Sequence, residues 1–286
     1  NASLGSFLIK VPERGNKETN MATKKIEKEV KKTVKSTKKI VKTVKKEVKE
    51  EVKVLKGSKE EMVKILFEAG AHFGHVARRW NPKMDKFLHG KRGGVHIFDL
   101  EKTVDAIEAA SEALTKWMSE GKTIALVGTK RQAKEIVRSE ADRVKLPFVV
   151  ERWLGGTITN WQQMKTRIDR LKKLKEERDS GALKSFTKKE RLLIDREIAK
   201  LERQFGGLAD LNSAPNIILV VDIRKERTAI KEAKIRGTKV VALVDSNTDP
   251  EPIDYPIPMN DDATAAVELV VRKLVGAIEL GLKKKK

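Results

Sequence analysis

Short, nearly continuous apolar segments alternate with amphipathic helical patterns from Ser58 to the C-terminus, and this alternation constrains the fold most. Five segments are rich in valine, isoleucine and leucine: 95–100, 123–128, 147–151, 216–222 and 239–245. Strands buried on both faces have this composition. Helical patterns lie at about 58–70, 102–119, 130–145, 226–236 and 262–282. The alternation predicts an α/β fold with a doubly wound, mostly parallel five-stranded sheet of the flavodoxin or Rossmann type.

One connection is too long for a single crossover helix, because 64 residues separate the segments 147–151 and 216–222. It contains two apolar stripes at helical spacing, which consist of Met164, Ile168, Leu171 and Leu174 and then of Ile194, Ile198, Leu201 and Phe205. Asp179-Ser180-Gly181 interrupts the pattern between them. We therefore expect residues 161–206 to form an antiparallel coiled-coil hairpin, inserted into an α/β domain made of residues 58–160 and 207–286.

Residues 1–57 differ from the rest of the chain, because lysine, valine, glutamate and threonine dominate them after Met21. Their charge favours a disordered basic extension, and the helical spacing of the valines leaves open an amphipathic helix that forms on RNA or on a protein neighbour. Met21-Ala-Thr-Lys-Lys resembles a translation start, and residues 17–20 can be encoded by a purine-rich ribosome-binding sequence. Residues 1–20 are therefore expected to be leader sequence that is not naturally translated.

The charge balance favours an anionic partner. Lysine and arginine total 62 against 41 aspartates and glutamates, a net charge of +21, so nucleic acid is the first expectation and an anionic membrane surface the second. Cysteine is absent, which excludes disulfides and thiolate metal sites. No apolar run approaches the roughly 20 residues that span a bilayer, and residues 1–20 lack a secretory signal pattern. We expect a soluble cytoplasmic protein without a membrane partner.

Three basic segments that contain or adjoin glycine hold most of the candidate RNA-binding residues. These are Arg78, Arg79, Trp80 and Lys83 in the first segment, Lys91 and Arg92 in the second, and Arg152 and Trp153 in the third. Glycine allows close backbone approach, the cations attract phosphates, and tryptophan can stack on a base or sugar. The structural alternative is that these are three unrelated turns and that each tryptophan anchors its loop to the core.

Gly128-Thr129-Lys130-Arg131 stands where a strand ends and a helix begins. Free backbone N–H groups there, together with Lys130 and Arg131, suit a phosphate, including one in an RNA backbone; a simple helix cap explains the segment equally well. Gly121-Lys122-Thr123 is not a phosphate loop, since it precedes a strand and lacks the first glycine of that motif. No nucleophile elbow or dinucleotide-binding glycine motif is present, and no catalytic residue is expected.

Metal binding has only weak support in the sequence. His72 and His75 are three residues apart, but nearby glycines and Asn81-Pro82 oppose a helix, and the adjacent cations would repel a metal. We interpret both histidines as residues that order the loop. Asp222, Asp245 and Asp249 follow predicted strands at the edge where doubly wound sheets bind ligands, and their oxygens could hold Mg²⁺. Capping and loop-tying roles explain these aspartates more simply, so no cofactor is expected and Mg²⁺ is the alternative.

Several long motifs resemble the bacterial ribosomal protein S2 family of the small subunit. They are EAGAHFGHVARRWNPKM, GGVHIFDLEKTVDAI, VGTKRQAKE, RWLGGTITNW, VVALVDSNTDP and IPMNDDA, in this order, and the resemblance runs from about Lys59 to Leu282. It implies a doubly wound domain with an inserted coiled-coil hairpin, no enzymatic activity, and a position on the solvent side of the small subunit between head and body. It also implies support for docking of the largest small-subunit protein near the messenger exit. Residues 1–57 depart from the family pattern.

The resulting expectation is a structural ribosomal protein that binds small-subunit ribosomal RNA and neighbouring ribosomal proteins, supports translation and late subunit assembly, and has no functional homo-oligomer. One rival is a nucleotide-binding α/β enzyme that uses Lys130 and the strand-end aspartates. Another is a DNA-compacting protein driven by the basic extension. The two rivals differ in what they require, because the first needs a nucleotide site with Mg²⁺ whereas the second needs only the extension.

Overall fold

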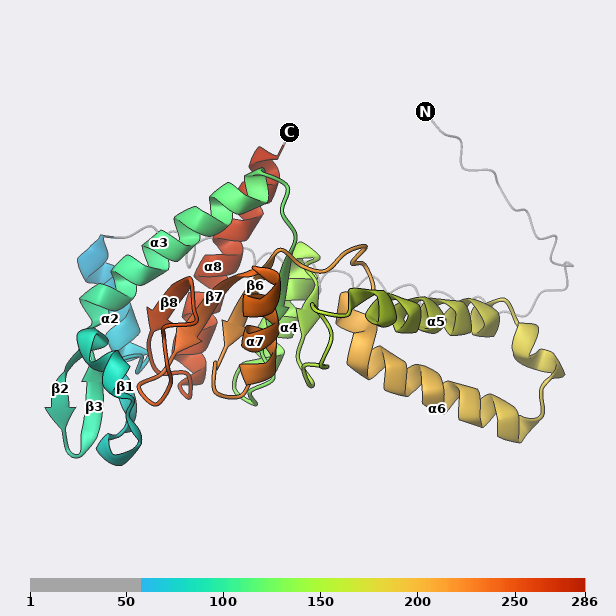
Figure 1. Cartoon of the computed structure of the whole chain (residues 1–286), viewed down its shortest axis with the longest axis horizontal. Helices are drawn as coiled ribbons and strands as arrows, with labels where there is room; N and C mark the ends of the chain where they lie inside the picture. Colours follow the sequence, from blue (N-terminus) through green and yellow to red (C-terminus); the bar gives the residue numbers. More distant parts are fainter. Residues whose placement is uncertain (1–57, 286) are drawn as a thin grey trace, which may run out of the picture. The chain divides into compact units, whose positions relative to one another are not determined.

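The computed structural model describes residues 58–285 (Figure 1). The predictions for residues 1–57, including the untranslated leader, lie outside the described residues. Helix α2 (Lys59–Glu68) begins where the sequence predicts, because Ser58 caps it in a reciprocal capping box with Glu61. No helix within the described range combines the length and the apolar character needed to cross a membrane.

A five-stranded parallel sheet forms the centre of the described chain. Its strands are β4 (Ile124–Val127), β5 (Phe148–Val149), β6 (Ile217–Val221), β7 (Lys239–Val244) and β8 (Tyr255–Pro258), in the order β5-β4-β6-β7-β8. Every neighbouring pair is parallel, with Leu126 opposite Leu219 and Leu243 opposite Ile257 in the register. The first strand of this sheet therefore lies beside the third, which is the flavodoxin-like order. The prediction of an α/β fold around a parallel sheet is confirmed.

One of the five strands predicted for the parallel sheet was wrong. Segment 95–100 was expected in the parallel sheet, but β3 (Val95–Phe98) belongs to a separate antiparallel sheet with β1 (Phe73–Val76) and β2 (Leu88–Arg92), in the order β1-β3-β2. The missing parallel strand is β8, with the sequence Tyr-Pro-Ile-Pro. Proline cannot donate a ladder hydrogen bond, but β8 is an edge strand, where one side needs no donors.

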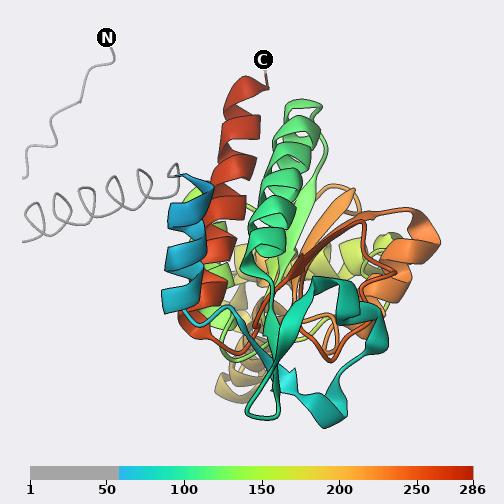
Figure 2. The same cartoon turned by 90° about the vertical axis from the view of Figure 1, so that its left-hand side faces the viewer.

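Helices cover both faces of the parallel sheet. Helices α3 (Leu100–Ser119) and α4 (Lys134–Val144) pack against α8 (Thr264–Lys284), and α2 packs against α3. Figure 2 shows α7 (Arg227–Arg236) on the opposite side of the sheet from α2, α3 and α8. Gly281 lets α3 and α8 approach closely, because a Cβ atom there would lie 2.6 Å from the Cβ of Met118.

The long connection forms a helical hairpin that projects to one side of the parallel sheet (Figure 1). It consists of α5 (Trp161–Asp179), a short 3₁₀ turn at Ala182–Ser185 and α6 (Lys188–Phe205), and the two helices contact each other. All four residues of the first predicted stripe are buried, and so are Ile198, Leu201 and Phe205 of the second. The two helices of the hairpin therefore pack through the stripes that the sequence predicts. Their apolar faces join the core that also contains α7 and one face of the sheet.

Candidate functional site

The antiparallel sheet brings two of the three predicted basic segments together. Arg78 and Arg79 lie in a 3₁₀ turn after β1, while Lys91 and Arg92 lie on β2, opposite His96 and Val95 of β3. All four cationic side chains are exposed. Because β1 and β2 flank the same central strand, cations that are 13 residues apart in sequence lie on or directly beside one small sheet.

Trp80 links these two segments. Its ring stacks on the buried His96 with a centroid distance of 4.8 Å, and the Lys91 ammonium lies 5.4 Å from the centroid of the Trp80 ring. Trp80 is half-buried, and the next residue, Asn81, donates its backbone N–H to the carbonyl of Ser246 at 2.8 Å. The tryptophan therefore anchors the loop to the sheet while one part of its surface stays accessible, a combination of the two roles considered from the sequence.

Lys83 is turned toward the chain's own carboxylates. Its ammonium pairs with Asp249 at 2.8 Å and also with Glu251. These hydrogen bonds raise the pKa of Lys83, and the hydrogen bond from Lys83 lowers the pKa of Asp249. The pair holds the loop that follows Asn81 against the segment after β7. Asp249, a predicted metal candidate, already has a cationic partner.

The third basic segment is organised by a buried glutamate of α7. Glu232 accepts hydrogen bonds from the Trp153 indole at 3.3 Å and from the backbone N–H groups of Gly156, Ile158 and Thr159 at 2.7, 3.0 and 3.2 Å. Trp153 is only 6% exposed and belongs to the core. Arg152, the preceding residue, is exposed. Trp153 therefore fixes the loop, and Arg152 is the cation that the loop presents. Glu232 lies 79 residues from Trp153, so no local sequence pattern could indicate this contact.

The two cations in the segment after β4 have different surroundings. Arg131 is exposed, but the Lys130 side chain is only 14% exposed and pairs with Asp261 at 2.7 Å and with Asp262 at 2.5 Å. Burial opposes the charge of Lys130, yet the carboxylates, chiefly Asp261, raise its pKa above the ordinary value. Helix α4 begins only at Lys134, four residues later than predicted. The ammonium of Lys130 is therefore directed at carboxylates within the protein.

The edge between β4 and β6 is the switch point where doubly wound sheets bind ligands. Here the Thr129 hydroxyl donates a hydrogen bond to Glu226, and the Lys225 ammonium donates to the Thr129 carbonyl at 2.8 Å. Glu226 is 2% exposed, and burial raises the pKa of its carboxyl. A nucleotide phosphate at this edge would face Glu226 and Asp222. The arrangement does not favour a phosphate ligand.

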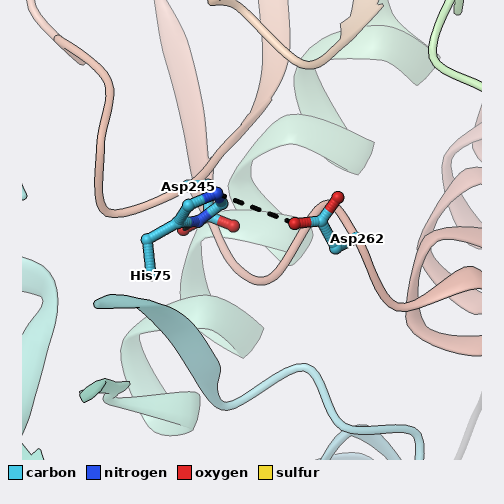
Figure 3. Close-up of side chains that lie close together, drawn as sticks. All are labelled: His75, Asp245 and Asp262. Atoms are coloured by element: carbon cyan, nitrogen blue, oxygen red, sulfur yellow. Dashed lines mark ion pairs between the residues drawn. The ribbon is translucent and has the colours of Figure 1, made fainter. Parts of the chain in front are cut away.

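The side chains of His75, Asp245 and Asp262, which come from distant segments, converge at one place (Figure 3), and the Lys130 ammonium pairs with Asp262 there. His75 of β1 lies with Nδ1 3.0 Å from an oxygen of Asp245, which follows β7, and with Nε2 3.7 Å from an oxygen of Asp262, which precedes α8. The hydrogen bond to Asp245 raises the pKa of His75. Burial would raise the pKa of Asp245, but His75 lowers it. These three residues, which we call the His75 cluster, join β1 to the carboxyl edge of the parallel sheet.

The His75 cluster could hold a divalent cation, because one ligand atom from each of its residues lies within 4.8 Å of the others. One imidazole nitrogen and two carboxylate oxygens suit zinc better than magnesium. Of the three predicted metal candidates, only Asp245 belongs to this cluster. Neither Asp222 nor Asp249 is part of it. The two carboxylates near His75 come from segments far along the chain, whereas the interpretation of His75 as a loop-ordering residue rests on its sequence neighbours.

Buried Asp261 adds to the negative charge beside the cluster. Its burial and the nearby charges of Asp245 and Asp222 raise the pKa of its carboxyl to about 8. His72, by contrast, is buried between Phe67 and Phe73, with ring centroids 4.2 and 3.9 Å away, and burial lowers its pKa. The two histidines of the first segment thus have different surroundings: His72 packs on aromatic rings, and His75 contacts carboxylates.

Comparison with known proteins identifies similar chains. A family model described as ribosomal protein S2 matches residues 66–281. The chain is 47% identical over 216 residues to the small ribosomal subunit protein uS2 of Coprothermobacter proteolyticus, a match that covers 76% of this chain and 81% of that protein. It is 44% identical over 224 residues to the protein of the same name from Maridesulfovibrio salexigens, covering 78% of this chain and 86% of the relative.

Proposed function

Because the chain belongs to the ribosomal protein S2 family, we propose that its exposed loop cations bind the phosphate backbone of small-subunit ribosomal RNA. Members of this family are structural constituents of the small ribosomal subunit and are not enzymes. The protein is accordingly a structural, ribosome-associated component of the translation apparatus.

The observation that carries the proposal is the small antiparallel sheet with its free cations. Arg78, Arg79, Lys91 and Arg92 are exposed, and within residues 58–285 no carboxylate forms an ion pair with any of them. These free cations, on β2 and in the turn after β1, are available for phosphates, because they need not leave an internal partner first. Trp80, whose ring lies under Lys91, gives this surface one aromatic side chain for a sugar or base.

The remaining candidates contribute in two ways. Arg131 and Arg152 are exposed and extend the proposed interface along the carboxyl edge of the parallel sheet. Lys83 and Lys130 hold internal carboxylates, and Trp153 is buried, so in this proposal these three shape the loops that carry the contacting arginines. An RNA phosphate would have to displace an existing ion pair to bind Lys83 or Lys130, and for the largely buried pair of Lys130 with Asp261 this costs more than binding a free arginine.

The finer assignments belong to the same proposal. The hairpin of residues 161–206 is an insertion into a domain made of residues 58–160 and 207–286, and it packs as an antiparallel coiled coil. It carries 14 basic and 8 acidic residues between positions 163 and 204, which supports contact with RNA. Neighbouring ribosomal proteins are further partners, the protein acts in the cytoplasm on the ribosome, and it supports late subunit assembly. No functional homo-oligomer is part of this proposal.

The nucleotide-binding alternative is less well supported by the geometry. It requires Lys130 to face a phosphate, whereas the Lys130 ammonium lies between Asp261 and Asp262. It also requires an open switch point, whereas Thr129 there donates a hydrogen bond to Glu226 and accepts one from Lys225. Titration with a nucleotide and Mg²⁺ should therefore release no binding heat.

Co-sedimentation with small subunits that lack this protein tests the proposed interface. Wild type should co-sediment, and log K should fall with log salt by roughly 0.7–0.9 for each phosphate contact, by analogy with DNA and single strands. Arg78→Ala combined with Arg152→Ala should weaken binding and lower that slope. Glu112→Ala, at an exposed position of α3, serves as the unchanged control. Binding and slope identical to wild type in the double variant would contradict the loop assignment.

A further inference from the structure

In helix α7 and the turn before it, the basic side chains are exposed and the acidic side chains are buried. Six cations, Arg224, Lys225, Arg227, Lys231, Lys234 and Arg236, are all exposed. The two acidic residues of this stretch are buried, since Glu226 is 2% and Glu232 is 6% exposed. Small and apolar side chains of the inner face pack on the sheet. The outer face of α7, defined by these six cations, therefore carries positive charge without an exposed acid.

Most of these cations have no internal partner. Within residues 58–285, no carboxylate forms an ion pair with Arg224, Arg227, Lys231 or Lys234. Lys234 helps to lower the pKa of Asp249, but the hydrogen bond from Lys83 is the main cause of that shift. Arg236 donates to a neutral backbone carbonyl, that of Thr159, at 3.3 Å. Like charges on one short helix repel each other, so the free protein holds this charge at a cost that an anionic partner would remove.

We infer that the outer face of α7 is a second RNA-backbone-binding surface, continuous with the loops that present Arg131 and Arg152. This inference rests on the proposed function and adds a surface to it. The continuity comes from the buried glutamates. Glu226 accepts from Thr129, which precedes Arg131 by two residues, and Glu232 accepts from the backbone of the loop that follows Arg152. Helix α7 and its N-cap residue Glu226 therefore fix both loops from the inner side, and the helix presents cations on its outer side.

The composition of the surface favours a polyanion over a protein or a membrane. Its only large exposed apolar side chain is Ile235, 74% exposed, whereas stable protein interfaces have an apolar centre depleted of charge. A membrane-bound amphipathic helix needs a wide apolar face to enter the lipid, and the apolar face of α7 is already packed on the sheet. A row of free cations is the arrangement that neutralises successive phosphates.

Three of the cations form one line along the helix. Arg227, Lys231 and Lys234 are spaced i, i+4 and i+7, which places them on one stripe that spans about 10 Å at 1.5 Å per residue. Such a stripe can follow an RNA strand over a few nucleotides. Each contact should contribute roughly 0.7–0.9 to the slope of log K against log salt.

The test is a combined variant of the full chain, Arg227→Gln, Lys231→Gln and Lys234→Gln, in binding to small subunits that lack this protein. Its salt slope should be lower than that of wild type by about 2. The matched control is Lys64→Gln, Lys116→Gln and Arg138→Gln, which removes the same charge from exposed positions on α2, α3 and α4. The control should keep most of the wild-type slope, and circular dichroism should show that both variants are folded.

The outcomes separate the two claims. If wild type binds the subunits and the α7 variant keeps its slope, or if the control loses as much slope as the α7 variant, the surface on α7 is refuted while the proposed function stands. If the α7 variant binds protein-free small-subunit RNA like wild type but binds subunits more weakly, the partner of α7 is an acidic protein and the RNA assignment is refuted. If wild type itself does not bind the subunits, the proposed function fails.

Discussion

Removing the carboxylate of Glu232 should destabilise the loop of residues 153–159 more than any surface change. Five groups donate hydrogen bonds to this carboxylate: the Trp153 indole, the backbone N–H groups of Gly156, Ile158 and Thr159, and the Thr159 hydroxyl at 3.3 Å. In Glu232→Ala, water can replace the carboxylate only for the donors near the surface. The Trp153 indole and the Ile158 N–H are in buried residues and would lose their acceptor.

The magnitude follows from those two donors. A buried donor without a partner costs about 1–3 kcal/mol, and a hydrogen bond to a charged group contributes about 1.5–3 kcal/mol. Glu232→Ala should therefore lower the free energy of unfolding by about 4 kcal/mol. Glu232→Gln keeps one acceptor oxygen of similar shape but turns an amide N–H₂ toward N–H donors, so about 2 kcal/mol should be lost.

Urea denaturation measures this change, because a shift of the midpoint at constant slope reports stability. Glu112→Ala, the same substitution at an exposed helical position, should change stability by no more than about 0.5 kcal/mol. Hydrogen exchange of the Ile158 and Thr159 amides should also accelerate in Glu232→Ala relative to the rest of the domain. A loss below about 1 kcal/mol for Glu232→Ala, or unchanged amide exchange, would refute the assignment of Glu232 as the residue that organises the loop.

Three further predictions concern pH, helix packing and metal binding. Because the pKa of Asp261 is raised from 3.8 to about 8, the folded state keeps a proton that the unfolded state releases. Stability should therefore fall as pH rises from about 4 to 8, and urea midpoints of Asp261→Asn should lack most of that decline. Gly281→Ala places a Cβ atom 2.6 Å from Met118 and should cost about 1–3 kcal/mol in thermal unfolding, whereas Gly276→Ala, with open space around it, should be neutral or stabilising. Zn²⁺ at about 100 times its Kd should raise the free energy of unfolding by about 2.7 kcal/mol, EDTA should reverse the gain, and His75→Ala should abolish it; equal gains in both proteins would exclude His75 as a ligand.

The elements with strong periodicity could be predicted well from the sequence. The buried stripes of α5 and α6 and the Ser58 cap of α2 are local patterns, and they match the structure. Strands β4, β6 and β7 are continuous apolar runs and were recognised for that reason. Strand β8 was not among the predicted strands, because its two prolines disfavour a strand everywhere except at a sheet edge, where β8 lies.

The candidate site was predictable in composition but not in arrangement. The loops that present Arg78, Arg152 and Arg131 could be recognised because glycine, arginine and tryptophan cluster within a few residues. Which cations remain free could not be read from the sequence, since it depends on carboxylates far away along the chain. Lys130 is paired across 131 residues with Asp261, and Lys83 across 166 residues with Asp249.

The sequence by itself determined that helices cover a parallel sheet, because hydrophobic periodicity is a property of local segments. It also determined that the expected partner is negatively charged, because net charge is a property of the whole chain. Only the tertiary structure decided which residues meet. Parallel strands bring the segments that follow β7 and β8 to one edge, where β1 of the antiparallel sheet places His75 beside Asp245 and Asp262. The packing of α7 on the parallel sheet buries Glu226 and Glu232 beneath an outer face of cations. Burial and pairing are long-range consequences of packing, and they separate the free cations from those that the fold already holds.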